Sequence, residues 1–383
     1  MAFPNEAFED QRLQNAIALK VELDKRGAAD VATVMAFAAV VFINFLAVLF
    51  TLWNRNYPPI KAKSPLLMTC LFVGSTFWYI GDIRGHGHVQ QYGTGLADCH
   101  VSNIWMHAVS GMFAVCGLYA LRSQMLYQVF HLNQPCSGLK FFMPTIVYST
   151  IVLVFAIVMQ ALGDKRTTYY VPQLDICSGT NTYKITILTL LWGAVLYDAV
   201  MYWRIRNIKS SFNESREMAA VSSLSILVLL VTTLISFLKP SYPLLMPFRV
   251  TMTVIGQFCV HLTWWSIMAV PIYQCLFNRH TYLVKWRATL REDGLQREYR
   301  ADSSSGMQPI TDNATKSLQT SYGDKVTNTH AFYYGNESGA RLYAPMTYAD
   351  VGAIIGHEAP SAISNSCSGE SVIDSEGVGR KLV

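Results

Sequence analysis

The chain has 383 residues and a formal net charge of +5; 51% of its residues are hydrophobic and only 14% are charged. Because the apolar residues lie in long blocks, this composition excludes an ordinary soluble domain and indicates a polytopic membrane protein. The classes to compare are therefore receptors, transporters and membrane enzymes, and no nucleic-acid partner is expected.

The N-terminal segment, residues 1–30, alternates charged and apolar residues. It lacks a compact apolar core ahead of a small-residue cleavage site, which argues against a cleaved signal peptide. Leu13, Ile17 and Val21 recur at helical spacing, so we expect an amphipathic helix over about residues 6–26. We expect this helix to rest on the bilayer or on the bundle; the alternative is a lid over a ligand site.

Seven segments are long and apolar enough to cross about 30 Å of hydrocarbon at about 1.5 Å per residue. They lie near residues 31–52, 65–83, 101–121, 141–162, 184–203, 219–238 and 250–277. The prediction is an all-α membrane protein, with a seven-transmembrane helix bundle over residues 31–277 and the short amphipathic helix ahead of it.

Basic residues give the orientation of this bundle. The segments after the first, third, fifth and seventh spans hold three, two, four and six Lys or Arg residues, counted up to Arg300. By the positive-inside rule this bias favours an extracellular segment 1–30 and a cytoplasmic C-terminus. We expect a multi-pass protein of the plasma membrane.

The chain after the last span divides into two parts. Tyr282, Trp286 and Leu290 are spaced at i, i+4 and i+8 among basic residues. This pattern predicts a juxtamembrane amphipathic helix within residues 278–300, lying on the anionic inner leaflet. Residues 301–383 are rich in Ser, Thr, Gly and Asn without sustained apolar periodicity, so we expect a disordered cytoplasmic tail.

The stretch Asn54–Met68 joins the first two spans, and Ser64 followed by Pro65 predicts a helix N-cap with proline at the first helical position. Within this stretch, Pro-Pro-Ile-Lys-Ala-Lys-Ser-Pro resembles the first intracellular loop of class C-like seven-transmembrane receptors. The similarity is greatest to their fungal and plant relatives that are coupled to regulators of G-protein signalling. It extends over roughly residues 31–300.

The resemblance implies a G-protein-coupled receptor-like signal transducer, which senses an extracellular ligand and activates a heterotrimeric G protein. Such a receptor is not an enzyme and holds no cofactor or metal. Its partners are the G protein, the ligand, membrane lipids and, as an open alternative, a second copy in a homodimer. We expect neither a class C ectodomain, which does not fit in about 30 residues, nor a regulator-of-G-protein-signalling box in residues 301–383.

Two motifs refine the resemblance. Leu-Arg-Ser at residues 121–123 stands where rhodopsin-like receptors carry Asp-Arg-Tyr, which removes that class. Val-Pro-Ile-Tyr at residues 270–273 resembles the end of the seventh helix in class C receptors, although Ile272 stands where those usually carry lysine. Proline in the last turns predicts a kink there.

Two of the eight cysteines fall in predicted outer segments: Cys99 before the third span and Cys177 after the fourth. Disulfides persist only on the oxidising side of a membrane. In seven-transmembrane receptors a bridge at these positions ties the second outer loop to the third helix, so the resemblance implies a Cys99–Cys177 disulfide. The alternative is two unrelated free thiols.

Polar residues inside a bilayer are costly, so they are the default functional candidates. Two spans place such residues at helical spacing on one face each: Asn103, His107 and Ser110 in the third span, and Gln257, His261, Trp264 and Trp265 in the seventh. We expect the two faces to line a ligand pocket that opens to the outside. The alternative is that these groups only hydrogen-bond neighbouring helices.

A second candidate set lies toward the inner ends of the spans: Arg122, Asp198, Glu217, Lys61 and Lys63. Asp198 is an acidic residue within an apolar span and demands a cation or a proton. Arg122 is its expected partner, with Glu217 as a second acceptor. The resemblance implies a two-state switch or G-protein contact here; the alternative is that Arg122 reaches lipid phosphates and Asp198 pairs elsewhere.

Three other classes of membrane protein compete with a receptor. A retinal protein needs a lysine within the seventh span, and residues 250–277 contain none. A haem or zinc enzyme would use histidines, but no His-x-x-x-His lies within a span. A transporter of a small solute remains the main alternative, although the chain lacks a convincing internal repeat of the kind that transporters show.

Overall fold

The computed structural model describes residues 5–91, 98–130, 138–163, 166–205 and 214–292. Within these ranges the helices are α1 (Glu6–Ala18), α2 (Ala28–Trp53), α3 (Pro58–Ala62), α4 (Pro65–Gly85), the π-helix η1 (His100–Phe113), α5 (Ala114–Phe130), α6 (Leu139–Ala161), α7 (Asn181–Ile205), α8 (Glu214–Leu238), the 3-10 helix η3 (Tyr242–Leu244), α9 (Met246–Phe277) and α10 (Arg279–Glu292). The strands are β1 (Thr168–Val171) and β2 (Ile176–Gly179).

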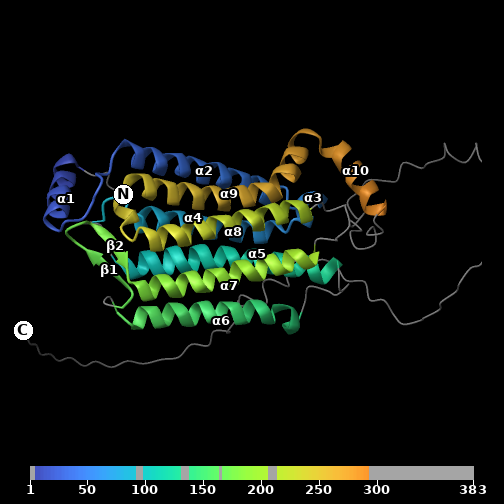
Figure 1. The fold of residues 1–383 in the computed structure, drawn as a ribbon. Coiled ribbons are helices and arrows are strands. Elements are labelled where there is room, and N and C mark those ends of the chain that lie inside the picture. Colours follow the sequence, from blue (N-terminus) through green and yellow to red (C-terminus); the bar gives the residue numbers. More distant parts are fainter. Residues whose placement is uncertain (1–4, 92–97, 131–137, 164–165, 206–213, 293–383) are drawn as a thin grey trace, which may run out of the picture. The chain divides into compact units, whose positions relative to one another are not determined.

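Seven helical segments of the described chain are long and apolar enough to span a membrane: α2, α4, η1 continued by α5, α6, α7, α8 and α9. They run alongside one another in Figure 1. Their outer faces are apolar; on α6, for example, Ile151, Val154 and Ile157 are about half exposed. Because faces of this kind are suited to lipid, the predicted all-α fold is confirmed, and the chain is a multi-pass membrane protein.

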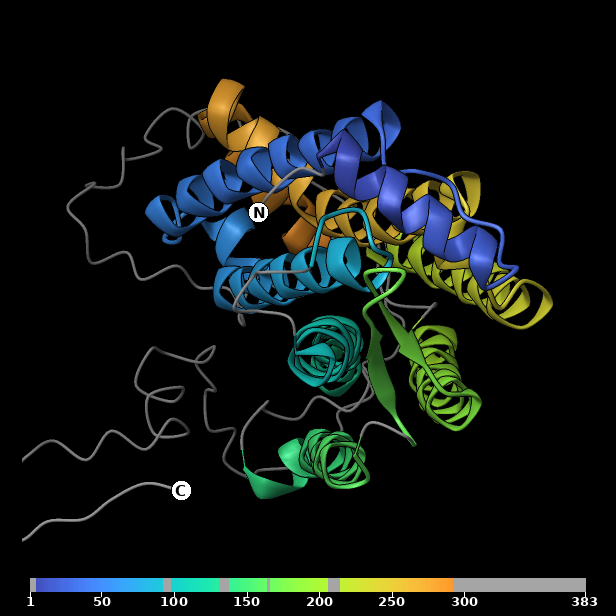
Figure 2. The same cartoon turned by 90° about the vertical axis from the view of Figure 1, so that its left-hand side faces the viewer.

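The bundle has two distinct ends. At one end, here called the hairpin end, lie α1 and the two strands, which Figure 2 shows from outside. At the other end, the α10 end, lie α3 and α10 (Figure 1). Helix α1 is shorter than the predicted helix over residues 6–26, and Ala16 packs with Leu174 and Ile176 of the hairpin. The predicted amphipathic helix therefore rests on the bundle.

The antiparallel β1–β2 hairpin was not predicted, because strands of four residues leave little periodicity in a sequence. Thr168 pairs with Gly179 and Val171 with Ile176. Cys177 of β2 forms a disulfide with Cys99, which immediately precedes η1, and their Cα atoms are 5.6 Å apart. The disulfide that the resemblance implied is confirmed, and it holds the hairpin on the start of the third span.

The segment between α2 and α4 differs in detail from the prediction. Helix α4 begins at Pro65, as expected, but Ser64 has φ 54° and its side chain makes no capping hydrogen bond. The predicted serine cap is therefore wrong, because the left-handed backbone at Ser64 differs from the extended backbone of an N-cap residue. The segment also contains the one-turn helix α3, whose Ile60 is completely buried.

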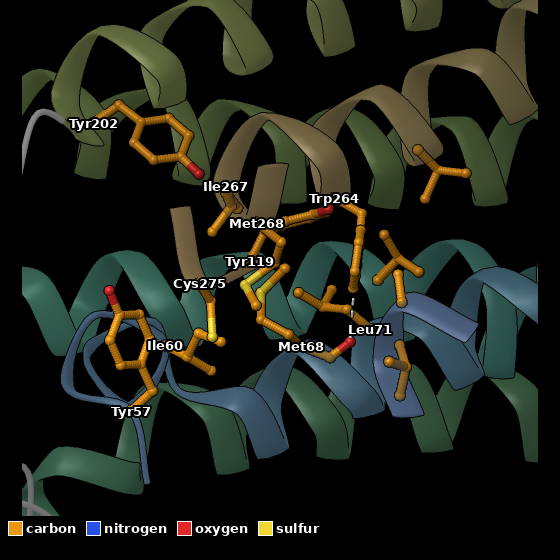
Figure 3. Close-up of a cluster of buried hydrophobic side chains, with 14 of the residues drawn as sticks. Tyr57, Ile60, Met68, Leu71, Tyr119, Tyr202, Trp264, Ile267, Met268 and Cys275 are labelled. Atoms are coloured by element: carbon orange, nitrogen blue, oxygen red, sulfur yellow. Dashed lines mark hydrogen bonds between the residues drawn. The ribbon is translucent and has the colours of Figure 1, made fainter. Parts of the chain in front are cut away.

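The largest apolar core lies between α2, α4, α5, α7 and α9, and Figure 3 shows its side chains. Trp264 is 3% exposed, and its indole nitrogen donates to the Met68 carbonyl at 3.1 Å. Met68 and Met268 are both completely buried in this core. Toward the α10 end the Tyr57 hydroxyl donates to the Arg279 carbonyl at 3.1 Å, so α10 is anchored to the α2–α4 connection.

Helices α4 and η1 approach each other closely, because glycines lie where they meet. A Cβ atom at Gly81 would lie 2.6 Å from the Cα of His107, and one at Gly111 would lie 2.7 Å from the Cα of Trp78. Both distances are too short for a real contact, so only glycine fits. Small residues at such positions let membrane helices pack backbone to backbone.

Candidate functional site

A buried carboxylate–guanidinium pair joins the first span to the last at the hairpin end. Asp30, in the first turn of α2, accepts from Arg249 Nε at 2.7 Å and from Arg249 Nη2 at 2.8 Å. Asp30 is 1% exposed and Arg249 is completely buried. His88 adds a third contact, with Nδ1 2.8 Å from the same carboxylate. Because a lone buried charge is costly, the pair fixes α2 against α9.

A second buried carboxylate, Asp82, lies one turn before the end of α4. His86 Nδ1 is 2.9 Å from Asp82 Oδ1, and His107 Nε2 of η1 is 3.5 Å from the same oxygen. Gln257 Nε2 of α9 is 3.5 Å from Oδ2. Among the described residues, Asp82 has no ion pair with a lysine or arginine. Three spans therefore converge on one carboxylate whose basic neighbours are histidines.

The turn after α4 connects the two carboxylates. Gly87 has φ +75°, a conformation that favours glycine and lets the chain reverse direction. This reversal places His86 Nδ1 2.9 Å and His88 Nε2 3.0 Å from the same atom, Thr253 Oγ1 of α9. His88 lies outside the spans, and burial lowers its pKa although Asp30 opposes the shift. Thr253 is thus shared by both sites.

Another buried network binds the N-terminal segment to the hairpin. Arg26 Nη1 donates to Asp175 Oδ2 at 2.7 Å, and Arg12 Nε donates to the Leu174 carbonyl at 2.7 Å. Arg12 also pairs with Glu9 on its own helix. Burial, followed by repulsion from Arg26, lowers the pKa of Arg12 to about 10. The N-terminal segment therefore covers the hairpin end through fixed ionic contacts.

The predicted ligand-pocket residues fall into separate groups. Asn103, His107 and Gln257 lie around the end of α4 where Asp82 stands. Deeper in the bundle, His261 Nδ1 is 2.7 Å from Asn44 Nδ2, and Trp265 Nε1 donates to Asn44 Oδ1 at 2.6 Å. His261 and Trp265 therefore hold α9 against α2, and they hydrogen-bond to Asn44 rather than to the Asp82 group.

The two remaining pocket candidates have other surroundings. Trp264 belongs to the apolar core. Ser110 is partly buried, and its carbonyl lies 3.4 Å from a Cβ placed on Gly74 of α4, so it faces the close α4–η1 contact. The sequence pattern therefore identified three members of the Asp82 group, and placed four other residues with them that the fold separates.

The predicted partners Arg122 and Asp198 form no ion pair among the described residues. Arg122 is 3% exposed and donates to the Lys63 carbonyl at 2.8 Å, which joins α5 to the end of α3. Asp198 Oδ1 is buried without a hydrogen bond, and its electrostatic neighbours include Cys116. The two side chains therefore have different neighbours, the Lys63 carbonyl for Arg122 and Cys116 for Asp198.

Three further residues completed that predicted switch. The side chain of Glu217 lies outside the described part of the structure. Lys61, on α3, is exposed, and Lys63 follows that helix and contributes its carbonyl to Arg122. The α10 end therefore has a basic residue accessible from outside the bundle, next to a buried arginine.

Sequence reasoning missed most of the charged centre of the site: Asp30, Asp82, His86, His88 and Arg249. All five lie at the margins of spans, where charged residues are common and attract little notice. The available signal was Asp82-x-x-x-His86, which places the two side chains on one helix face. Nothing local to Arg249 indicated that its partner would be Asp30.

Seven spans, a disulfide from the third span to the following hairpin, and polar residues gathered at one end define a receptor-type seven-helix bundle. Residues 27–272 match the family model described as the 7 transmembrane sweet-taste receptor of 3 GCPR. This match covers more than half of the chain, which therefore belongs to the class C family of G-protein-coupled receptors. No curated protein matches the chain significantly.

Proposed function

We propose that this chain is a plasma-membrane receptor that senses an extracellular ligand at its hairpin end and activates a heterotrimeric G protein at its α10 end. The observation that carries this proposal is the convergence of His107 and Gln257, from two different spans, on Asp82 of a third, with Asn103 beside Gly85 of the same helix. Buried polar groups brought together from separate spans are costly, and such groups in membrane proteins usually serve function.

The two ends differ in a way that supports the orientation. The hairpin end carries the disulfide, which requires an oxidising compartment. The α10 end carries basic residues in Lys61, Arg279 and Lys285, as expected next to a cytoplasmic leaflet. We also propose that the receptor is related to the fungal-type members of the family. The proposed division of the chain is an extracellular segment 1–30, a bundle 31–277, a cytoplasmic helix 278–300 and a tail 301–383.

Helix α9 offers a physical connection between the two ends. It runs from Arg249 and Gln257 at the hairpin end, through Trp264 in the apolar core, to the residues next to Arg279. A ligand that shifts Gln257 would also act on the packing of Trp264 against Met68. Coupling between the two ends needs an element that has two arrangements and contacts both ends, and we propose that α9 is this element.

The test is G-protein activation by the full chain in cells, with exchange of guanine nucleotide as the readout. We expect basal or ligand-dependent exchange that exceeds that of cells lacking the receptor. Gln257→Ala should change the response, whereas Gln14→Ala, at an exposed position of α1, should not. Surface expression with no exchange on any tested G protein, together with solute uptake, would instead favour the transporter alternative.

Orientation is tested by cysteine labelling in intact cells. Asn56, between α2 and α3, and Gln14, on α1, are both exposed. We expect an impermeant maleimide to label Gln14→Cys from outside and to label Asn56→Cys only after permeabilisation. Outside labelling of Asn56→Cys would reverse the proposed topology.

A further inference from the structure

Two hydrogen-bond acceptors of the Asp82 group have no donor among the described residues. Asn103 Oδ1 and Gln257 Oε1 are both buried and have no hydrogen-bond partner. The Oδ2 atom of Asp82 has one contact, from Gln257 Nε2 at 3.5 Å, which is at the long limit for a hydrogen bond. Buried oxygens without donors are costly, so this group is complete only when something else supplies positive charge or N–H bonds.

The charges around Asp82 also indicate a missing cation. Arg249, at this end of α9, is already engaged by both oxygens of Asp30. The other titratable groups that face Asp82 are His86 of the same turn, His107 of η1, and His88, Tyr79 and Tyr242. The Tyr242 ring closes the far side of His86, with the ring centres 5.8 Å apart. The carboxylate therefore lacks a permanent cationic partner among the described residues.

Asn103 approaches α4 close to the carboxylate. Gly85 lies three residues after Asp82 and shares its helix face, and a Cβ there would lie 3.1 Å from Asn103 Oδ1. The amide oxygen of Asn103 is thus directed at α4 one turn from the carboxylate. His107 is the most exposed member of the group, with its side chain 18% accessible, so entry is expected beside it.

We propose that Asp82, Asn103 and Gln257 bind a small monovalent cation, which is either an inorganic ion or the ammonium group of an organic ligand. The carboxylate supplies the charge, and the two amide oxygens supply the remaining contacts. This inference rests on the proposed function, because the cation is the ligand of a receptor only if the chain acts as one. Its test uses binding alone, on purified full-length receptor without G protein, so that the two proposals can fail separately.

The experiment measures the melting temperature of the receptor in nanodiscs while sodium, potassium or methylammonium chloride replaces N-methylglucamine chloride at constant ionic strength. We expect a saturable rise with at least one small cation, because a ligand that binds only the folded state stabilises it. Asp82→Asn should raise the half-saturating cation concentration by about tenfold or more, because binding becomes weaker. Asp10→Asn, at an exposed carboxylate of α1, should leave that concentration unchanged.

Further variants separate binding from folding. Asn103→Ala removes one amide oxygen without adding bulk, and Gly85→Ala places a methyl group 3.1 Å from that oxygen; both should weaken the cation response in receptor that still melts cooperatively. A response to sodium or potassium alone identifies an inorganic ion, and one to methylammonium alone identifies an amine ligand. No difference from N-methylglucamine in the wild type, or an unchanged response in Asp82→Asn, would overturn the proposal and leave water as the donor.

Discussion

Asp30 and Arg249 lie 219 positions apart in the sequence and form a doubly hydrogen-bonded, fully buried ion pair between α2 and α9. The pair closes the ring of helices at the hairpin end, because it links the first span to the last. His88, which joins it from the turn after α4, brings a third helix to the same point.

Arg249→Met should destabilise the receptor strongly, because it leaves the Asp30 carboxylate buried without its partner. The expected loss is about 3–5 kcal/mol in the free energy of unfolding, measured by denaturation in detergent micelles. Asp30→Asn in the Arg249→Met background should recover part of the loss. The exposed pair of Lys25 with Asp10 is the control, and Lys25→Ala should leave stability unchanged. Equal effects at both pairs would contradict the structure.

Gly81→Ala should destabilise by about 1–3 kcal/mol, because the added methyl group would overlap the backbone at His107. A methyl group added at Gly193, on α7, would have no atom within 4 Å, so Gly193→Ala should be neutral or stabilising. Thermal melting of the two purified variants makes the comparison. The opposite order of stabilities would show that α4 and η1 are not in close contact.

Arg122→Ala and Asp198→Asn should have additive effects on basal G-protein signalling and on stability. The reason is that Arg122 donates to the Lys63 carbonyl and forms no ion pair with Asp198 among the described residues. A double-mutant cycle checks this with surface expression held equal. A coupling of about 1 kcal/mol or more would mean that another conformation brings the two charges together.

The stability of the receptor should fall as pH decreases below about 6.5, in part because of His88. Burial lowers the pKa of His88 in the folded protein, so the unfolded chain takes up the proton first and is favoured at low pH. Across the range from about pH 7 to about pH 5, His88→Gln should lose less stability than the wild type. His280→Gln, at an exposed position of α10, should follow the wild-type profile.

Hydropathy and residue spacing were sufficient for the seven spans, the juxtamembrane helix and the start of α4 at Pro65. These features depend on local chemistry: apolar length fixes a span, and proline favours the first helical position. Cysteine position, taken with the family resemblance, was sufficient for the Cys99–Cys177 bridge. The α6 span, for instance, needs no partner to be identified, since its apolar run is long enough by itself.

Only the tertiary structure decided which polar residues meet. Helical spacing gave Gln257 and His261 the same face, yet the fold joins Gln257 to Asp82 and His261 to Asn44, because each depth of α9 meets a different neighbour. Asp30 and Arg249 lie in unrelated local contexts, and at the margin of a span water can solvate either side chain. Their pairing follows from the closure of the helix ring, a long-range property that no segment of the sequence contains.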